Sequence, residues 1–285
     1  MSLIKAIRKD KELLADVEYH KHGSEDFTCW WLGQSGFLIQ YKGQRLLIDP
    51  YLSDSLTKKY ENTEKPHVRM SERVIDPALF QGINIVTSSH NHTDHLDAET
   101  LIPILENNPS IQMIIPEANR SFVADRLKAS PDFFKGMSDG IEYQAGHFHL
   151  YGLPAAHNTI DRDEKGNCKY MGYIVRFGNW TVYHSGDTLL YDGLEEMLNE
   201  FSIDLALLPI NGNDPSRGVA GNLSADEAIK LSKQCGIKCL VPCHYDMFTF
   251  NTADINEFAM LAKAAGQLYC LLDGGGKIAG SELSE

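Results

Sequence analysis

The residues with the clearest chemical potential lie between His90 and His95, where the chain reads His-Asn-His-Thr-Asp-His. This run directly follows residues 84–88, in which β-branched Ile85, Val86 and Thr87 are typical of a buried strand. Alternate residues of an extended segment point to the same side, so His90 and His92 can reach one metal ion. Asp94 and His95 follow where the chain begins to curl, and can reach a second. Imidazole and carboxylate are ligands that Zn²⁺ and its first-row neighbours prefer, so the run predicts a metal site.

The His-x-His-x-Asp-His run resembles the signature of the metallo-β-lactamase superfamily. The resemblance implies further site residues, in the order in which that superfamily presents them. Asp49, after Leu-Leu-Ile, resembles the early Asp that supports the metal loop, and His157, in Pro-Ala-Ala-His-Asn, resembles the third ligand of the first metal. Asp187, in His-Ser-Gly-Asp-Thr, resembles the bridging carboxylate, and His244, in Val-Pro-Cys-His, the last ligand of the second metal. Their order along the chain, each behind a strand-like segment, makes the set more specific than any single member.

A narrower resemblance, to the branch that includes L-ascorbate-6-phosphate lactonases, extends from about residue 27 to residue 272. It rests on Trp-Trp-Leu-Gly-Gln-Ser-Gly from Trp30, Tyr-His-Ser-Gly-Asp from Tyr183, Ile-Asp-Leu-Ala-Leu from Ile203 and Pro-Cys-His-Tyr-Asp from Pro242. The segment Asn213-Asp214-Pro215-Ser216-Arg217-Gly218 resembles that branch's Asn-Pro-Arg-Gly turn. Asn213 and Arg217 are therefore candidate ligands of an anionic substrate group, because a guanidinium matches phosphate or carboxylate. The alternative is a turn with a surface Arg.

The expected chemistry is hydrolysis by two divalent cations, Zn²⁺ or Mn²⁺ rather than Fe²⁺. Cations about 3.5–4 Å apart share a water and lower its pKa toward neutrality, which yields a bridging hydroxide nucleophile. Asp94 is also expected to orient that hydroxide and protonate the leaving group. His184 and Tyr245 flank ligand positions, and either donate to an oxyanion or support the ligands. The expected ligand sets are His90, His92 and His157 for the first metal, Asp94, His95 and His244 for the second, and Asp187 between them.

The elements that must position these residues alternate in type along the chain. Helical spacing predicts an amphipathic helix over residues 3–17, and three strands follow at 29–32, 37–41 and 45–48. Further strands are predicted at 84–88, 111–115, 148–153, 170–177, 180–184, 203–208, 239–243 and 267–272, and helices at 97–106, 118–128, 190–200, 224–234 and 253–264. Strand-rich stretches followed by β/α alternation, occurring twice, favour an α/β (α+β) architecture of two mixed sheets flanked by helices. With the resemblance, this predicts the four-layer αββα sandwich of the metallo-β-lactamase fold, as one domain over residues 1–285 with residues 1–26 as a helical extension.

Composition narrows the expected partners. The net charge of −13, from 26 basic and 39 acidic residues, disfavours nucleic acid and fits a small-molecule substrate. The absence of a long apolar run predicts no membrane segment and no signal peptide, and hence a cytoplasmic protein, with a homo-oligomer left open. Six scattered Cys indicate free thiols, and Cys235, Cys239 and Cys243 are expected to be buried and inert. Trp30 and Trp31 are expected in the core rather than against substrate.

Several functions remain open at this stage. The leading prediction is hydrolysis of a small ester, most specifically a lactone such as a phosphorylated sugar lactone. The alternative is a phosphodiesterase acting on a small molecule or a phospholipid head group. A thioesterase of the glyoxalase type is disfavoured because those sequences continue as Asp-His-x-Gly-Gly, whereas Leu96 and Asp97 follow His95 here. Redox chemistry at a di-iron site would need a flavin domain for which there is no room. A non-catalytic metal-binding protein is the alternative of another class.

Overall fold

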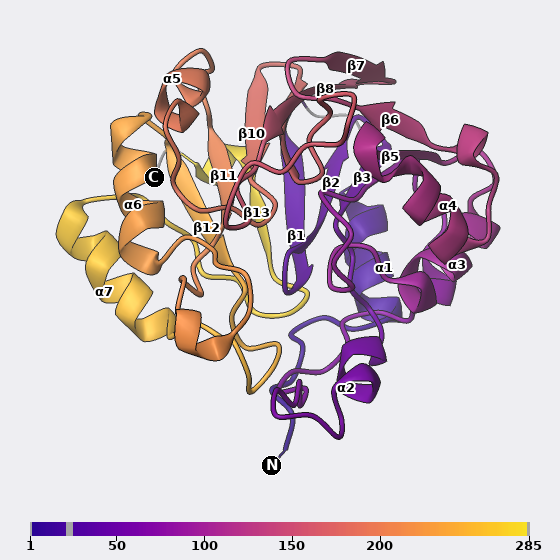
Figure 1. Cartoon of the computed structure of the whole chain (residues 1–285), viewed down its shortest axis with the longest axis horizontal. Coiled ribbons are helices and arrows are strands. Elements are labelled where there is room, and N and C mark those ends of the chain that lie inside the picture. Colours follow the sequence, from indigo (N-terminus) through magenta and orange to yellow (C-terminus); the bar gives the residue numbers. More distant parts are fainter. Residues whose placement is uncertain (1, 21–24, 284–285) are drawn as a thin grey trace.

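Two mixed β-sheets, packed face to face, form the centre of the molecule, and helices cover their outer faces (Figure 1). The computed structural model describes residues 2–20 and 25–283, so residues 1 and 21–24 of the expected N-terminal extension lie outside the described part. The first sheet has the order β13 (Lys277–Ala279), β1 (Phe27–Gly33), β2 (Gly36–Tyr41), β3 (Gln44–Ile48), β4 (Ile85–Thr87), β5 (Gln112–Pro116) and β6 (Lys135–Met137). The second has the order β12 (Cys239–Cys243), β11 (Leu205–Pro209), β10 (Trp180–His184), β9 (Met171–Phe177), β8 (Phe148–Pro154) and β7 (Glu142–Ala145). The predicted sandwich is confirmed.

Strands β1 to β3 are buried on both faces, and alternate side chains enter two different cores. In β2, Leu38 packs with Leu13 and Val17 of helix α1 (Lys11–Tyr19), whereas Phe37 and Ile39 enter the space between the sheets. Successive side chains of a strand point to opposite faces, which produces this division. Each large apolar side chain buried in this way stabilises the fold by about 1.5–3 kcal/mol.

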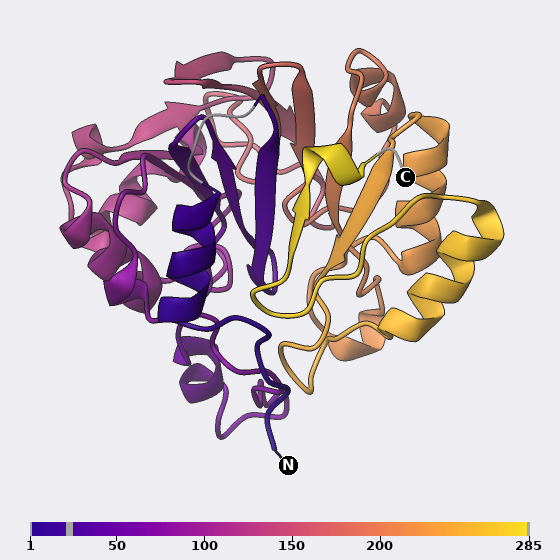
Figure 2. The ribbon, with the colours of Figure 1, turned by 180° about the vertical axis from the view of Figure 1, so that it is seen from behind.

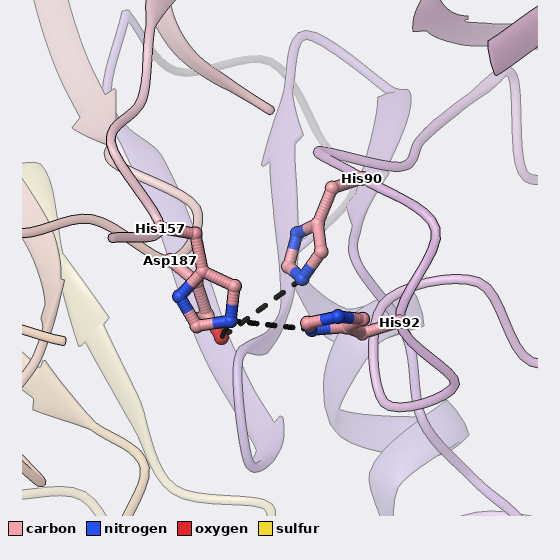
Figure 3. A group of neighbouring side chains, drawn as sticks. All are labelled: His90, His92, His157 and Asp187. Carbon is pink, nitrogen blue, oxygen red and sulfur yellow. Dashed lines mark hydrogen bonds and ion pairs between the residues drawn. The ribbon is translucent and has the colours of Figure 1, made fainter. Parts of the chain in front are cut away.

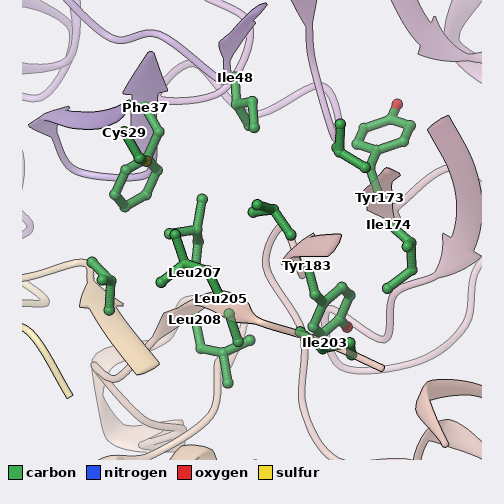
Figure 4. Packing of buried hydrophobic residues seen from close by; sticks show 14 of the residues in the cluster. Cys29, Phe37, Ile48, Tyr173, Ile174, Tyr183, Ile203, Leu205, Leu207 and Leu208 are labelled. Carbon is green, nitrogen blue, oxygen red and sulfur yellow. The ribbon is translucent and has the colours of Figure 1, made fainter. Parts of the chain in front are cut away.

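The core between the sheets joins strands that are distant in sequence. Figure 4 shows Cys29, Phe37 and Ile48 of the first sheet facing Leu205 and Leu207 of the second. The two Trp residues follow the alternation of β1. Trp30 lies on the helix-covered side and Trp31 on the inter-sheet side, and both are buried, as predicted. The predicted inert thiols Cys235, Cys239 and Cys243 are also free and buried.

The helices cover the sheets from both sides (Figures 1 and 2). Helices α1, α3 (Ala98–Asn107) and α4 (Arg120–Leu127) contribute apolar residues to the core on the outer face of the first sheet. Helices α5 (Leu194–Leu198), α6 (Ala225–Gln234) and α7 (Ile255–Ala265) pack against the second sheet, and the short helix α2 (Ser55–Lys59) lies apart from both. No helix in the described part of the chain is long and apolar enough to cross a bilayer.

Local side chains define where several of these helices begin. Helix α6 starts with a capping box, in which Ser224 and Glu227 satisfy each other's backbone N–H groups. At α3, Asp97 occupies the N-cap position, but its carboxylate accepts from the Thr100 hydroxyl at 2.5 Å instead of from a backbone N–H. Helices α1 and α5 are shorter than predicted, since α1 begins only at Lys11 and α5 only at Leu194.

Strand direction decides where the loops emerge. β3 and β4 are parallel in the first sheet, and β10, β11 and β12 are parallel in the second. The residues that follow such strands emerge at the same edge, which is where ligands bind in open α/β sheets. The predicted strand at 267–272 is wrong, because this segment makes only a single bridge, between Tyr269 and Leu240. The C-terminal strand is instead β13, which pairs antiparallel with β1.

Candidate metal centre

The seven predicted ligands converge at the edge where the two sheets meet. Their donor atoms form two groups, and within each group the atoms lie within 4.8 Å of one another. The loop after β4 provides one side of the centre. The ends of β8, β10 and β12 in the second sheet provide the other side. The first donor group is His90, His92, His157 and Asp187, and the second is Asp94, His95 and His244.

In the first donor group, imidazoles from opposite sheets face one carboxylate (Figure 3). His157 Nε2 lies 3.2 Å from His92 Nδ1 and 3.5 Å from Asp187 Oδ2. His90 Nε2 lies 3.9 Å from the same oxygen. The other ring nitrogen of His157, Nδ1, contacts the Gly221 carbonyl at 2.8 Å and donates to it. That bond orients the ring and leaves Nε2 free to bind a metal.

The second donor group faces the other oxygen of Asp187. His244 Nε2 lies 2.9 Å and His95 Nε2 3.2 Å from Asp187 Oδ1. Asp94 Oδ2 lies 3.6 Å from His95 Nε2. Each oxygen of Asp187 therefore faces one donor group, which is the arrangement expected of a bridging carboxylate.

Several donor atoms lack hydrogen-bond partners in the protein, which a bound metal ion would explain. His90 Nε2, His95 Nε2, His244 Nε2 and Asp187 Oδ1 are all buried, and among the described residues none of them has a hydrogen-bond partner of acceptable geometry. Leaving buried polar atoms unsatisfied costs about 1–3 kcal/mol each, so their concentration at one point needs a reason. Nitrogen and carboxylate donors at these separations suit divalent cations such as Zn²⁺ or Mn²⁺.

Burial and mutual charge shift the pKa values of these groups. Burial, reinforced by the imidazoles of His95 and His92, lowers the pKa of His90 well below its usual value. Burial opposes ionisation of Asp187, but His244 and His95 outweigh it and hold the pKa of that carboxyl well below its usual value. The same interaction, despite burial, raises the pKa of His95. The lowered pKa of Asp187 favours its ionised form, which is the form that binds a metal ion.

Asp49 supports the site from behind, where the resemblance placed it. Its carboxylate accepts from His95 Nδ1 at 2.7 Å and from the Ser89 backbone N–H at 2.9 Å, and also from the Ser89 hydroxyl. The first of these bonds leaves His95 Nε2 free to face Asp187. Ser89 Oγ in turn lies 3.0 Å from His90 Nδ1, so one carboxylate orients rings of both donor groups.

Two residues contact the donors without having been predicted from the sequence. The Gln34 side-chain amide donates to Asp94 Oδ2 at 2.9 Å and lies 3.1 Å from His244 Nδ1. Gln34 belongs to the Gly-Gln-Ser-Gly turn between β1 and β2, and that motif was the only signal in the sequence. The Tyr170 ring lies 5.2 Å from His90, 5.5 Å from His157 and 6.0 Å from His92, between ring centroids. Nothing in the residues around Tyr170 indicated this position.

Backbone strain accompanies the site. His244 has φ 63° and Asp49 has φ 41°, the left-handed region that non-glycine residues rarely adopt. The strained conformation costs on the order of 1–3 kcal/mol per residue and persists only where the surroundings hold it. At His244 the chain cannot use glycine, because the imidazole is the donor.

The structure does not bring His184 or Tyr245 to the donor groups. His184 Nε2 contacts the Ser35 carbonyl at 3.1 Å, and its Nδ1 accepts from the Gly186 N–H at 3.3 Å. The Tyr245 hydroxyl donates to the Leu272 carbonyl, and its ring stacks on Trp31 with centroids 4.5 Å apart. Both side chains hold the ends of strands together rather than face the centre.

Asn213 and Arg217 also lie apart from the donors, and neither lines the cleft beside them. The Arg217 guanidinium donates to the carbonyls of Asn211 and Gly212, both at 2.9 Å, and to Asn251 Oδ1 at 2.6 Å. Asn213 is exposed. The guanidinium therefore holds its own turn, and its role as an anion ligand stays a prediction without support from this geometry.

A cleft of about 490 Å³ opens onto the donor groups. This volume lies within the range typical of small-molecule sites. The residues that line it include five of the donors, His92, Asp94, His157, Asp187 and His244. Arg126 of α4 also lines it and donates to the carbonyls of Asn91 at 2.7 Å and Leu96 at 3.0 Å, which braces the His-rich loop.

Comparison with known proteins identifies the family. The Beta-lactamase superfamily domain matches residues 28–244. A metal-dependent hydrolase of Archaeoglobus fulgidus is 30% identical over 240 residues, which cover 83% of this chain and 90% of that protein. A probable L-ascorbate-6-phosphate lactonase of Escherichia coli is 21% identical over 311 residues, covering 92% and 84%. The solved structure of Igni18, a metallo hydrolase from Ignicoccus hospitalis, has a TM-score of 0.64 at 21% identity and covers 89% of this chain and 98% of that one.

The chain belongs to the metallo-β-lactamase superfamily, so the resemblance predicted from its sequence is confirmed. The family, the fold and the His/Asp donor set together define a metal-dependent hydrolase that binds divalent metal.

Proposed function

We propose that this protein hydrolyses a small ester, most specifically a lactone, with two divalent cations held by the two donor groups. The observation that carries the proposal is the convergence on the Asp187 carboxylate of three buried imidazole nitrogens that lack a hydrogen-bond partner, Nε2 of His90, His95 and His244. The 490 Å³ cleft suits a small substrate. The similarity to a probable lactonase, over 92% of this chain, favours a lactone among small esters.

Divalent cations held by these residues would supply Lewis acidity, which makes water nucleophilic near neutral pH and polarises the carbonyl oxygen of an ester. The protein's own groups then orient the reactants. Asp94 lines the cleft, and its Oδ2 accepts a hydrogen bond from the Gln34 amide. To this carboxylate we assign the orientation of the attacking water and the transfer of a proton to the leaving oxygen. His157 and His95 are held from behind by the Gly221 carbonyl and by Asp49, which limits rearrangement during the reaction.

The test is Asp187→Asn, which keeps the size of the side chain and removes its charge. We expect metal content to fall and kcat/KM toward lactones to drop by at least about 100-fold, because both donor groups lose their shared anion. The matched control is Asp204→Asn. Asp204 is another buried carboxylate, and it accepts from Lys238 at 2.6 Å and from the Thr181 N–H at 2.8 Å at the opposite end of β11.

Metal content is measured by elemental analysis, and activity on a panel of lactones, phosphodiesters and thioesters. Turnover of phosphodiesters alone would replace the lactone proposal with the phosphodiesterase alternative. An Asp187→Asn variant with full metal content and full activity would refute the assignment of the site.

A further inference from the structure

One side of the cleft is formed by two segments that are far apart in the sequence, residues 51–70 and residues 245–253, which we call the α2 wall. Backbone hydrogen bonds join them, from the Thr249 N–H to the Val68 carbonyl at 2.9 Å and from the Met70 N–H to the Met247 carbonyl at 2.9 Å. Arg69 and Phe248 form an antiparallel bridge between the same segments. Backbone hydrogen bonds therefore hold the two segments of the wall together.

Aromatic rings back this wall on the cleft side. The His67 ring stacks on Tyr60 with centroids 4.4 Å apart and lies 5.1 Å from Phe250 and 5.3 Å from Phe248. All four residues line the cleft. Burial lowers the pKa of His67 and outweighs the hydrogen bond with the Lys65 backbone and the charge of Asp94, which both raise it. The rings give the wall a low-dielectric surface, on which a charge interacts more strongly than it does in open water.

Two Lys residues of this wall also line the cleft, and Lys59 is exposed. Lys59 Nζ lies over the Tyr60 ring, 5.2 Å from its centroid, and Lys65 Nζ donates to the Gly218 carbonyl. A Lys ammonium has three donors, so Lys65 keeps two for another partner. Within residues 2–20 and 25–283, neither Lys59 nor Lys65 forms an ion pair with a carboxylate, unlike Lys58, whose Nζ lies 2.9 Å from Glu99.

The charge of the cleft is opposite to that of the whole chain. The described residues that line it include Lys59, Lys65 and Arg126, whereas its only acidic members are Asp94 and Asp187, both in the donor groups. Bound cations would offset those two carboxylates. The chain as a whole carries −13. A protein that repels anions over its surface but lines one cleft with cations attracts anions to that cleft.

We propose that Lys59 and Lys65 bind an anionic group of the substrate, a phosphate or a carboxylate, at the α2 wall of the cleft that opens onto the metal centre. The substrate is then an ester whose scissile bond lies at the donor groups while its charged arm reaches the α2 wall. This inference rests on the proposed function for the identity of the reacting bond. It also places anion recognition on residues that the sequence did not single out.

The test compares three lactones that share one ring and differ only in the arm, which ends in a hydroxyl, a carboxylate or a phosphate. The metal-loaded protein is studied as wild type and as the Lys59→Gln/Lys65→Gln double variant. Lys65→Arg retains the charge, and Lys230→Gln removes an exposed charge from α6 outside the cleft. Hydrolysis gives kcat and KM, and calorimetric titration measures binding of the intact lactones under conditions of slow turnover.

We expect wild type to prefer an anionic arm over the hydroxyl arm, and the double variant to lose at least about tenfold of that preference, mainly through KM. Lys65→Arg and Lys230→Gln should keep the preference, and raised salt should reduce it in wild type. The preferred arm distinguishes phosphate from carboxylate. Equal binding of the anionic lactones by wild type and double variant overturns this inference. If no lactone is hydrolysed but the anionic ones bind through the two Lys residues, the proposed reaction fails and the anion site stands.

Discussion

The support given by Asp49 can be tested apart from catalysis. In the wild type, His95 Nδ1 and the Ser89 N–H lie 2.7 and 2.9 Å from the two different carboxylate oxygens of Asp49. In Asp49→Asn the side chain keeps its shape, but only one acceptor oxygen remains for these two donors. One hydrogen bond to a charged group is lost, which is about 1.5–3 kcal/mol. Each 1.4 kcal/mol changes a binding constant about tenfold. Loss of partners that support metal ligands weakens metal binding about 10–100-fold, so we expect the metal affinity of Asp49→Asn to decrease by about 10–100-fold.

The assay is competition for metal between the protein and a chromogenic chelator, with chemical unfolding of the metal-free protein measured alongside. Asp204→Asn is again the matched control, because it removes a buried carboxylate that does not contact the donors. The control should lose stability and keep its metal affinity. The reasoning is refuted if Asp49→Asn binds metal within twofold of wild type, or if its loss of affinity is equalled by Asp204→Asn.

Two further predictions concern residues outside the ligand set. Tyr170→Leu should weaken metal binding at the first donor group selectively, because the Tyr170 ring lies against three imidazoles of that group. A metal titration should show a lower affinity for one of the two ions and an unchanged affinity for the other, whereas Tyr170→Phe should behave as wild type. Asp16→Asn should lower the free energy of unfolding near pH 7 by about 1–3 kcal/mol, since Asp16 accepts from Trp30 Nε1 at 2.8 Å and Lys277 Nζ at 2.7 Å. Burial opposes ionisation of Asp16, but these bonds outweigh burial and lower the pKa of the carboxyl. The stabilisation is therefore present above the carboxyl's ordinary pKa of about 4 and is lost as the pH falls below it. A difference in unfolding free energy between wild type and Asp16→Asn that does not change with pH would contradict this prediction.

The sequence predicted the interior of the fold better than its edges. Strands β2 and β3 are buried on both faces, and their continuous apolar runs leave few other interpretations. The edge strands β6 and β7 were not predicted, because each is short and partly exposed, with no apolar pattern to reveal it. β13 was missed for a related reason. It has three residues and pairs with β1 across about 250 positions, a tertiary contact that local pattern cannot encode.

The candidate site divides in the same way. The metal donors could be predicted because their residue types are rare in combination and each follows a strand. Residues that act by position alone could not. Gln34 and Tyr170 are ordinary residue types whose contacts with the donors depend on the meeting of the two sheets. Arg217 was predicted to bind an anion from its residue type alone. In the structure its guanidinium already donates to neighbouring carbonyls, which the residue type could not reveal.

The division of the donors between the two sheets has a consequence for how the protein matures. The loop after β4 holds one part of the metal centre, and the ends of β8, β10 and β12 hold the rest. Neither half of the polypeptide contains a complete coordination sphere. High-affinity metal uptake therefore has to wait until the halves have docked, and ion loading becomes a marker of the last stage of folding. Bound cations in turn stabilise the contact between the two halves, so chelation should weaken that contact before either sheet unfolds.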